Sequence, residues 1–151
     1  MSQAPFRYDI VGSFLRPTAV LAARAKFNEG AITADELRAV EDKAITELVE
    51  KQKAVGLKAV TDGEFRRAFW HIDFLEGLMG VNEEVAEAWS TQFKGHNPKA
   101  LTLKVTGKID FPEDHPHVAD FKFLQSLVGD DVLAKMTIPS PSMLYHIVAV
   151  R

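Results

Sequence analysis

The residues best suited to chemistry lie in one stretch, GLKAVTDGEFRRAFWHIDFLEGL, residues 56–78. Gly56 is suited to end a helix, because glycine readily adopts the left-handed conformation found there. Lys58 to Thr61 has β character, and acidic and basic side chains follow it directly from Asp62 to Arg67. In α/β enzymes the carboxyl ends of strands carry the reacting groups. The stretch therefore predicts either a ligand site at a strand end or a solvated loop with ion pairs.

The elements before this stretch predict a βαβ unit. Residues 8–14 (YDIVGSF) have strand character, and Pro17 suits the first turn of a helix that would stop at Gly30. Thr33 and Glu36 form a capping box at the start of a second helix, whose apolar residues recur at helical spacing. Two strands joined through helices imply parallel pairing and a right-handed crossover.

The elements after this stretch are shorter and mixed in type. We expect helices at Glu83 to Phe93 and Val118 to Leu127. The segments Leu101 to Val105 and Gly107 to Asp110 read as strand pieces that can form a hairpin beside the main sheet. Residues 111–117 (FPEDHPH) read as a polar loop, Ala134 to Ile138 as a third buried strand, and residues 143–151 as the opening of a further element.

The composition limits the classes of protein to which the chain can belong. The 151 residues are 46% hydrophobic and 26% charged, the balance of a globular protein of one ordinary domain. The net charge of −3 argues against broad binding to nucleic acid or anionic membranes. The chain has no cysteine, no apolar run near the roughly 20 residues that span a bilayer, and no signal-peptide core at its start. We expect a cytoplasmic protein.

The fold class expected from these elements is α/β. Successive βα units with polar residues at the strand ends suggest an α/β barrel, which needs about 250 residues. This chain supplies roughly three of the main strands. Two interpretations stay open at this point, a smaller open sheet and the first part of a longer barrel.

Three ordered segments resemble the cobalamin-independent methionine synthase family, and most closely its short single-barrel homologues. They are Val11-Gly12-Ser13-Phe14-Leu15-Arg16-Pro17, residues 56–78 with Asp62-Gly63-Glu64-Phe65-Arg66-Arg67, and Thr137-Ile138-Pro139-Ser140-Pro141-Ser142. The resemblance implies a (β/α)₈ barrel. Residues 1–151 would be its N-terminal portion, with about three βα units and a small β-hairpin insertion.

The resemblance also implies an activity and a cofactor. Such enzymes serve methionine biosynthesis by transferring a methyl group from a folate donor, 5-methyltetrahydropteroyltriglutamate, to homocysteine. A zinc ion binds the thiol, and a metal-bound thiol is deprotonated. The family's zinc ligands are a histidine, two cysteines and a glutamate from later strands. This sequence lacks cysteine, so we expect a chain with no metal site that is inactive by itself as an S-methyltransferase.

Four positions match the family's substrate-binding residues, and no catalytic residue is assigned. Val11, Gly12 and Ser13 match the loop that holds the carboxylate and backbone of homocysteine. Glu64 matches the carboxylate that pairs with its ammonium group, a charge-assisted hydrogen bond. Asp62 replaces the histidine usual in the large synthases, and the folate contacts have no clear counterpart in residues 90–100. A family member that alkylates another small thiol therefore remains the alternative.

Other polar residues have both a pocket and a structural interpretation. Asp62, Arg67, His71, Ser140 and Ser142 are further candidates to line the pocket. The structural alternatives are a salt bridge from Glu64 to Arg66 or Arg67, a turn or capping role for Ser13, and pairing of one arginine with Asp62 or Asp73. Trp70 and Phe74 would share a helix face as core residues. His115 and His117 are too few for a zinc site.

The expected partner is a small thiol amino acid, with no nucleic acid and no membrane. A partial barrel leaves strand edges unpaired, and such edges invite association with another chain. The alternative to an enzyme is therefore a non-catalytic truncated module that forms a homo-oligomer through these edges or binds a missing C-terminal half.

Overall fold

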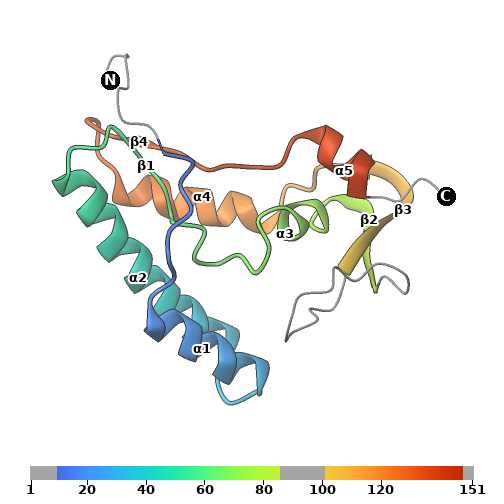
Figure 1. The fold of residues 1–151 in the computed structure, drawn as a ribbon, viewed down its shortest axis with the longest axis horizontal. Helices are drawn as coiled ribbons and strands as arrows, with labels where there is room; N and C mark the ends of the chain where they lie inside the picture. The colour runs from blue at the N-terminus through green and yellow to red at the C-terminus, as the bar shows by residue number, and fades with distance from the viewer. Residues whose placement is uncertain (1–9, 86–100, 148–151) are drawn as a thin grey trace, which may run out of the picture. The chain divides into compact units, whose positions relative to one another are not determined.

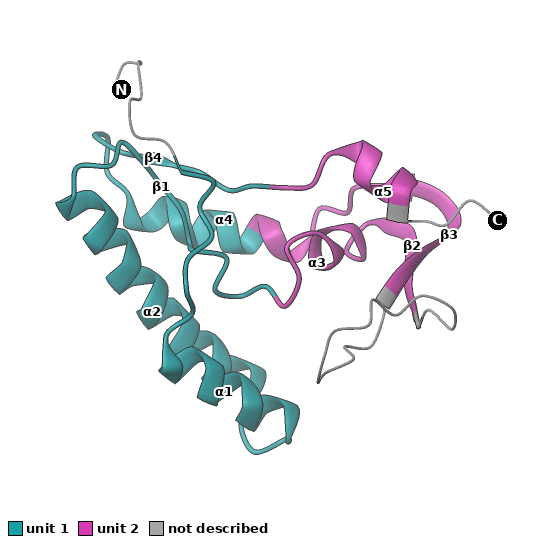
Figure 2. Ribbon diagram, in the orientation of Figure 1, with its two compact units in different colours: residues 1–67, 119–137 teal, residues 68–118, 138–151 magenta. Residues whose placement is uncertain are grey.

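A computed structural model of the chain describes residues 10–85 and 101–147, drawn in Figure 1. The chain divides into two compact units, coloured separately in Figure 2. Unit 1 comprises residues 1–67 and 119–137, and unit 2 comprises residues 68–118 and 138–151.

Two helices of unit 1 confirm the local signals in the sequence. Helix α1 (Thr18–Asn28) follows Pro17, which takes the N-cap position rather than a place in the first turn. Helix α2 (Ala34–Ala54) begins with the complete capping box of Thr33 and Glu36, in which each side chain binds the backbone of the other residue. Gly56 has φ +86°, the left-handed conformation that ends this helix.

Three chain segments of unit 1 run parallel to one another. Strand β1 (Ala59–Val60) pairs with β4 (Leu133–Ala134), and a single parallel bridge joins Ser13 to Gly63. The Ser13 segment and β4 thus flank the chain that runs through β1. The strand predicted at residues 58–61 is confirmed in part as β1. The described residues of the segment 8–14 form only the bridge at Ser13, and residues 8 and 9 lie outside the described part. The buried strand predicted at 134–138 is wrong beyond Ala134, because β4 ends there and residues 134–138 are half-buried or exposed.

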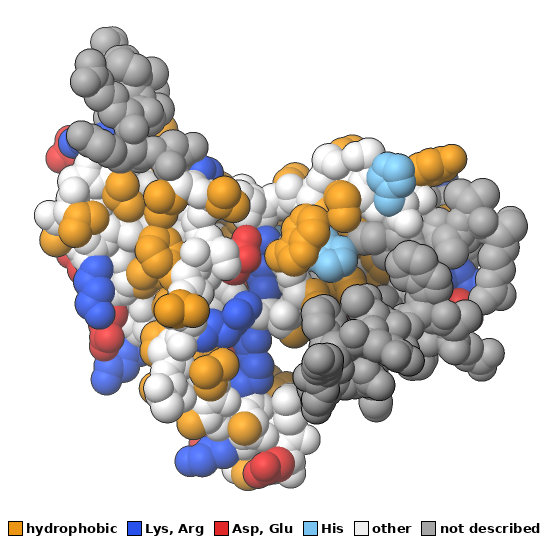
Figure 3. All heavy atoms as spheres, viewed as in Figure 1, with side chains coloured by type: hydrophobic (Ala, Val, Ile, Leu, Met, Phe, Trp, Pro, Cys, Tyr) orange, Lys and Arg blue, Asp and Glu red, His pale blue; other side chains and the backbone are white. Residues whose placement is uncertain are grey.

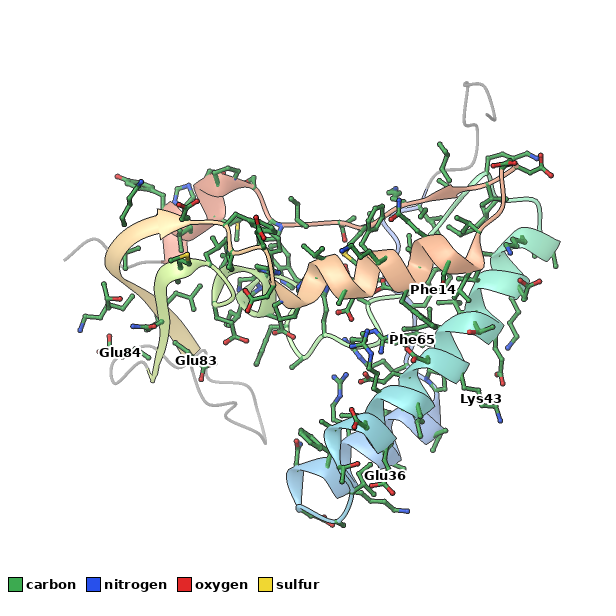
Figure 4. All side chains as sticks on the ribbon, turned by 180° about the vertical axis from the view of Figure 1, so that it is seen from behind. Phe14, Glu36, Lys43, Phe65, Glu83 and Glu84 are labelled. Carbon is green, nitrogen blue, oxygen red and sulfur yellow. The ribbon has the colours of Figure 1, made fainter. Side chains whose placement is uncertain are left out.

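The core of unit 1 forms between these segments and the helices. Its buried residues come from α1, α2, β1, the turn after β1, and α4 (Pro116–Leu127): Val20, Ala44, Ile45, Val49, Val60, Phe65 and Leu124. Phe14 packs against this cluster, and Figure 4 shows Phe14 and Phe65 beside α2. Glu36 and Lys43 of α2 are exposed, so the helix is amphipathic as its spacing predicts.

Gly12 lies directly against the side chain of Thr61. Its φ is +117°, and a Cβ atom at this position would lie 2.4 Å from Thr61 Cγ2. The Thr61 hydroxyl donates a hydrogen bond to the Gly12 carbonyl (2.6 Å), and Gln52 binds both backbone groups of Thr61. The first segment is therefore fastened to the end of β1, and only glycine fits at the contact.

Unit 2 is built on an antiparallel pair, β2 (Met79–Val85) and β3 (Leu101–Asp110). The predicted helix from Glu83 to Phe93 is wrong over its first residues, which continue β2; residues 86–93 lie outside the described part. The two predicted strand pieces at 101–110 form one continuous strand, and its partner is β2. An antiparallel pair is therefore present between β1 and β4 in the sequence. It is formed by β2 and β3, and not by residues 101–105 with residues 107–110 as predicted.

Short helices and two histidines complete unit 2. Helix α3 (Ile72–Leu75) and helix α5 (Pro141–Ile147) contribute Phe74 and Leu144 to a core with Val81 and Leu103. Trp70 precedes α3 and is 53% exposed, so the prediction that it shares a buried helix face with Phe74 is wrong. Among the described residues, no helix is long and apolar enough to cross a membrane.

The predicted polar loop at residues 111–117 is wrong at its last residues. His115 and His117 are buried, at 1% and 8% exposure, and α4 begins at Pro116. The backbone N–H of His117 donates to His115 Nδ1 (3.2 Å), while His115 Nε2 lies 3.0 Å from the carbonyl oxygen of Phe74. These contacts fit a neutral imidazole with its proton on Nε2. The two histidines are therefore core residues of unit 2.

Substitution of Gly12 tests the close approach to Thr61. Gly12→Ala should destabilise unit 1 by about 1–3 kcal/mol more than Gly30→Ala, because Gly30 (φ +72°) has no atom within 4 Å of a Cβ. Urea unfolding followed by helical circular dichroism measures both. Thr61→Ser removes the clashing methyl group, so it should recover part of the loss in the Gly12→Ala background. Equal losses for the two glycines would contradict the contact.

The carboxyl group of Glu76 predicts a pH dependence for unit 2. Desolvation, a hydrogen bond to Glu83 and the charges of Asp73 and Glu83 raise the pKa of Glu76 to about 7. The folded state therefore keeps a proton that the unfolded chain releases near pH 4.5, and the free energy of unfolding should fall as pH rises from about 4.5 to about 7. Glu76→Gln should flatten this fall.

Tryptophan fluorescence can follow the unfolding, because both tryptophans of the chain lie within residues 68–118. Urea titrations at pH 5 and pH 8 compare the variant with the unaltered chain. Glu113→Gln, an exposed position of the same unit, is the matched control. An unchanged pH dependence in Glu76→Gln would show that another group is responsible.

Candidate functional site

The candidate site lies in unit 1, where three parallel segments end side by side. Ser13 is bridged to Gly63, Glu64 follows directly, and Thr137 lies three residues beyond β4. The carboxyl ends of parallel strands meet at one edge of a sheet, and this edge carries ligand sites in α/β proteins. The structure thus brings together Gly12, Ser13, Asp62, Glu64 and Arg67 from the predicted set.

The turn after β1 places Glu64 in an unusual backbone conformation. Glu64 has φ +57° and is the only non-glycine residue with positive φ in the described part of the chain. Asp62 Oδ1 accepts a hydrogen bond from the Glu64 backbone N–H (2.9 Å), and Asp62 is only 4% exposed. Asp62 was a candidate pocket residue, and its observed role is to hold this turn.

The Glu64 carboxylate is fixed by two neighbours. Its Oε1 atom lies 3.3 Å from Arg67 Nη1, and it accepts a hydrogen bond from Thr137 Oγ1 (2.9 Å). The salt bridge to Arg67 that the sequence left open is therefore present. Thr137 was not among the predicted site residues, because nothing in the sequence indicates which hydroxyl of the third segment reaches Glu64.

Two arginines bind the backbone of the same turn. Arg16 donates to the carbonyl oxygens of Glu64 (3.0 Å) and Arg67 (2.5 Å), and Arg24 donates to those of Phe65 (2.7 Å) and Arg67 (2.8 Å). Figure 3 shows Lys and Arg side chains gathered beside α1 on one face of the molecule. Sequence reasoning missed this role, because the acceptors are backbone groups that any residue carries.

Arg66 points to a different set of carboxylates. It forms ion pairs with Glu41 (3.3 Å), Asp42 and Asp120 (3.2 Å), and its guanidinium lies over the ring of Phe123. The sequence analysis expected one arginine, Arg66 or Arg67, to pair with Asp62 or Asp73; this residue is not Arg66, since its partners lie on α2 and α4. Burial raises the pKa of Asp120 although Arg66 and Arg38 act to lower it. Arg66 thus holds the turn to α2 and α4 through these ion pairs.

The three residues of the first segment differ in exposure. Val11 is 75% exposed and Ser13 is exposed, while Gly12 is buried against Thr61. Ser13 does not cap α1, because Pro17 occupies the N-cap position. The Ser13 hydroxyl is therefore accessible at the strand end, and the conformational freedom of Gly12 serves the contact with Thr61.

Three predicted pocket residues, His71, Ser140 and Ser142, belong to unit 2. The ring of His71 lies beside that of Trp70, with centroids 4.3 Å apart and planes tilted by 39°, and burial lowers the pKa of His71. Ser140 and Ser142 share a hydrogen bond between their hydroxyl oxygens (2.7 Å), and both are exposed. The Asp73 carboxylate accepts from the backbone N–H groups of Ala68 and Phe69.

The described residues do not fit the zinc site that the resemblance implies. Within residues 10–85 and 101–147, no group of three or more His, Cys, Asp or Glu side chains could hold a metal ion. The whole sequence contains no cysteine, so a ligand set with two thiolates cannot be assembled from this chain. Glu64 and Ser13 are instead suited to bind and orient a small polar ligand.

Comparison with known proteins identifies the family. A model of the cobalamin-independent synthase catalytic domain matches residues 7–100. Two proteins of Bacillus subtilis (strain 168), YxjH and YxjG, both described as uncharacterized, are 52% identical to this chain over 143 and 141 residues. These alignments cover 95% and 93% of this chain but 37% and 36% of the relatives, so the chain spans little more than a third of their length.

Two solved structures agree with this result. A candidate vitamin-B12-independent methionine synthase from Listeria monocytogenes is 49% identical, with a TM-score of 0.78 over 96% of this chain and 39% of that one. A B12-independent methionine synthase from Shewanella sp. W3-18-1, in complex with selenomethionine, is 22% identical, with a TM-score of 0.58 over 78% of this chain and 33% of that one. The second supports the fold alone. The sequence and structural matches together show that the chain belongs to the catalytic-domain family of the cobalamin-independent methionine synthases.

Proposed function

We propose that this chain supplies the amino-acid-binding part of a methionine-synthase-like S-methyltransferase. In this proposal Glu64 pairs with the ammonium group of homocysteine, and Val11, Gly12 and Ser13 bind its carboxylate and backbone. The parallel segment around Ser13, β1 and β4 would be the first strands of a (β/α)₈ barrel. The full activity would transfer a methyl group from a folate donor to the thiol, with zinc ligands that are not among the described residues.

The observation that carries this proposal is the state of the Glu64 carboxylate. Glu64 is 8% exposed, ends a parallel strand segment, and makes both of its side-chain hydrogen bonds within the described residues through Oε1. Its Oε2 atom is the oxygen left for a ligand, and 10% of the side chain remains accessible. A carboxylate fixed in this way suits a primary ammonium group, which donates charge-assisted hydrogen bonds.

The identity of the acceptor thiol is a more specific part of the proposal than the binding of an amino acid. Asp62, which differs from the histidine of the large synthases, holds the Glu64 turn and lies 4% exposed. This position therefore offers little surface to a substrate. A relative that alkylates another small thiol amino acid would use the same ammonium contact, so the two alternatives differ only in groups beyond Glu64.

Ligand binding by the 151-residue chain tests the proposal. Isothermal titration with L-homocysteine under reducing conditions, and with the expected product L-methionine, should detect binding. Glu64→Gln should weaken both by about tenfold or more, because it replaces the charge of the ammonium partner with a neutral amide. Methyl transfer is not expected from this chain alone.

Glu47→Gln is the matched control, since Glu47 is an exposed carboxylate of α2 in the same unit. It should bind both amino acids as the unaltered chain does. Absence of binding by the unaltered chain, or equal binding by Glu64→Gln, would contradict the proposed function. A panel of other small thiol amino acids then separates homocysteine from the alternative acceptors.

A second candidate function is association through strand edges. Within the described residues β4 pairs only with β1, and Val11 and Leu15 are 75% and 97% exposed beside the Ser13 bridge. Open edges and apolar side chains of this kind favour binding of another chain. A mass by light scattering at twice 16.8 kDa would support a homodimer, whereas a monomer at all concentrations would exclude it.

A further inference from the structure

Thr137 contacts both partners of the salt bridge at the strand ends. Its hydroxyl donates to Glu64 Oε1 (2.9 Å), and its carbonyl oxygen accepts from Arg67 Nη2 (2.5 Å). Arg67 Nη1 in turn lies 3.3 Å from Glu64 Oε1. The three residues thus form a closed ring of hydrogen bonds that joins the end of the β1 segment to the end of the β4 segment.

This ring fixes which carboxylate oxygen is free. Both donors reach Oε1, and the contact from Thr137 is the shorter of the two. Threonine has two heavy atoms on Cβ, so its χ1 rotamer is restricted and its hydroxyl keeps a narrow range of positions. The backbone of Glu64 is held separately by Asp62. The carboxylate is therefore restrained at both ends of the side chain, and Oε2 remains for a ligand.

We propose that Thr137 is a positioning residue that sets the preference of this site for ligands with a primary amine. The inference rests on the proposed function, because it takes Glu64 to be the partner of the ligand ammonium group. The Thr137 hydroxyl holds Oε1 and so keeps Oε2 oriented for the amine. Without this hydroxyl, the carboxylate can rotate about its terminal bond, and Oε2 is no longer presented in one geometry.

A merely structural role for Thr137 makes a different prediction. If the ring served only to join the β1 and β4 segments, loss of the hydroxyl would lower stability and weaken every ligand to the same extent. A positioning role requires a selective loss for ligands that carry the amine. The informative quantity is therefore the ratio of two dissociation constants in one variant.

The experiment compares L-methionine with 4-(methylthio)butanoate, which lacks the amine but keeps the carboxylate and thioether. Dissociation constants are measured by isothermal titration for the unaltered 151-residue chain, Thr137→Val, Thr137→Ser and Glu64→Gln. The unaltered chain should prefer L-methionine by about tenfold or more. Thr137→Val, which keeps the shape of the side chain, should lower this preference about fivefold, while Thr137→Ser should stay within about twofold of the original.

The controls separate folding from positioning. Thr46→Val removes a hydroxyl of the same unit that donates to the Asp42 carbonyl in α2, and it should leave the preference unchanged. Circular dichroism checks that each variant is folded. Thr137→Ala, which also lacks the hydroxyl but is smaller, replaces Thr137→Val if the latter does not fold, and the same fall in preference is expected.

The outcomes distinguish this inference from the proposed function. A selective loss in Thr137→Val with recovery in Thr137→Ser supports the positioning role. An unchanged preference in Thr137→Val, together with a lost preference in Glu64→Gln, overturns the role of Thr137 and leaves the proposed function standing. An unchanged preference in Glu64→Gln, or no binding by the unaltered chain, overturns both.

Discussion

Unit 1 depends on how the turn after β1 satisfies its backbone carbonyl groups. Glu64, Phe65 and Arg67 are buried, and a buried carbonyl without a donor costs about as much as a lost hydrogen bond. Arg16 and Arg24 supply these donors from positions more than 40 residues earlier in the chain. The guanidinium group suits this task, because its fork of N–H donors reaches two acceptors at once. Through Arg24, helix α1 therefore helps to hold the turn that carries Glu64.

Arginines placed in this way bring charge that the surrounding helices must balance. Arg24 pairs with Glu41 of α2 (3.0 Å), and Arg66 pairs with carboxylates of α2 and α4. Removal of one partner from such a partly buried network leaves an uncompensated charge, which is more costly than loss of an exposed ion pair. Burial raises the pKa of the Asp120 carboxyl group, although the charges of Arg66 and Arg38 act to lower it. The helices thus set the position of the turn through charge as well as through apolar packing.

The sequence predicts the features that depend on a few neighbouring residues. The capping box at Thr33, the helix end at Gly56 and the parallel order of three segments are all confirmed. It fails at Glu83, where glutamates with good helix propensity lie in a strand. In this segment Val81 is buried, while Glu83 and Glu84 are exposed. Pairing with β3, about twenty residues away in the sequence, therefore determines that residues 83–85 form a strand and not a helix. The roles of Arg16, Arg24 and Thr137 likewise arise only from long-range contacts.

At the candidate site, the sequence analysis treated two roles of Glu64 as alternatives. A salt bridge to Arg67 and contact with a ligand appeared to exclude each other, because both would use one carboxylate. In the structure Arg67 and Thr137 bind Oε1, and Oε2 makes no hydrogen bond within the described residues. The left-handed backbone of Glu64 costs roughly 1–2 kcal/mol for a residue with a side chain. Arg67 is 4% exposed, and a buried guanidinium group is costly without a negative partner. The ion pair therefore accounts for the presence of an acidic residue in a strained position, and its use of a single oxygen leaves the other compatible with an amine.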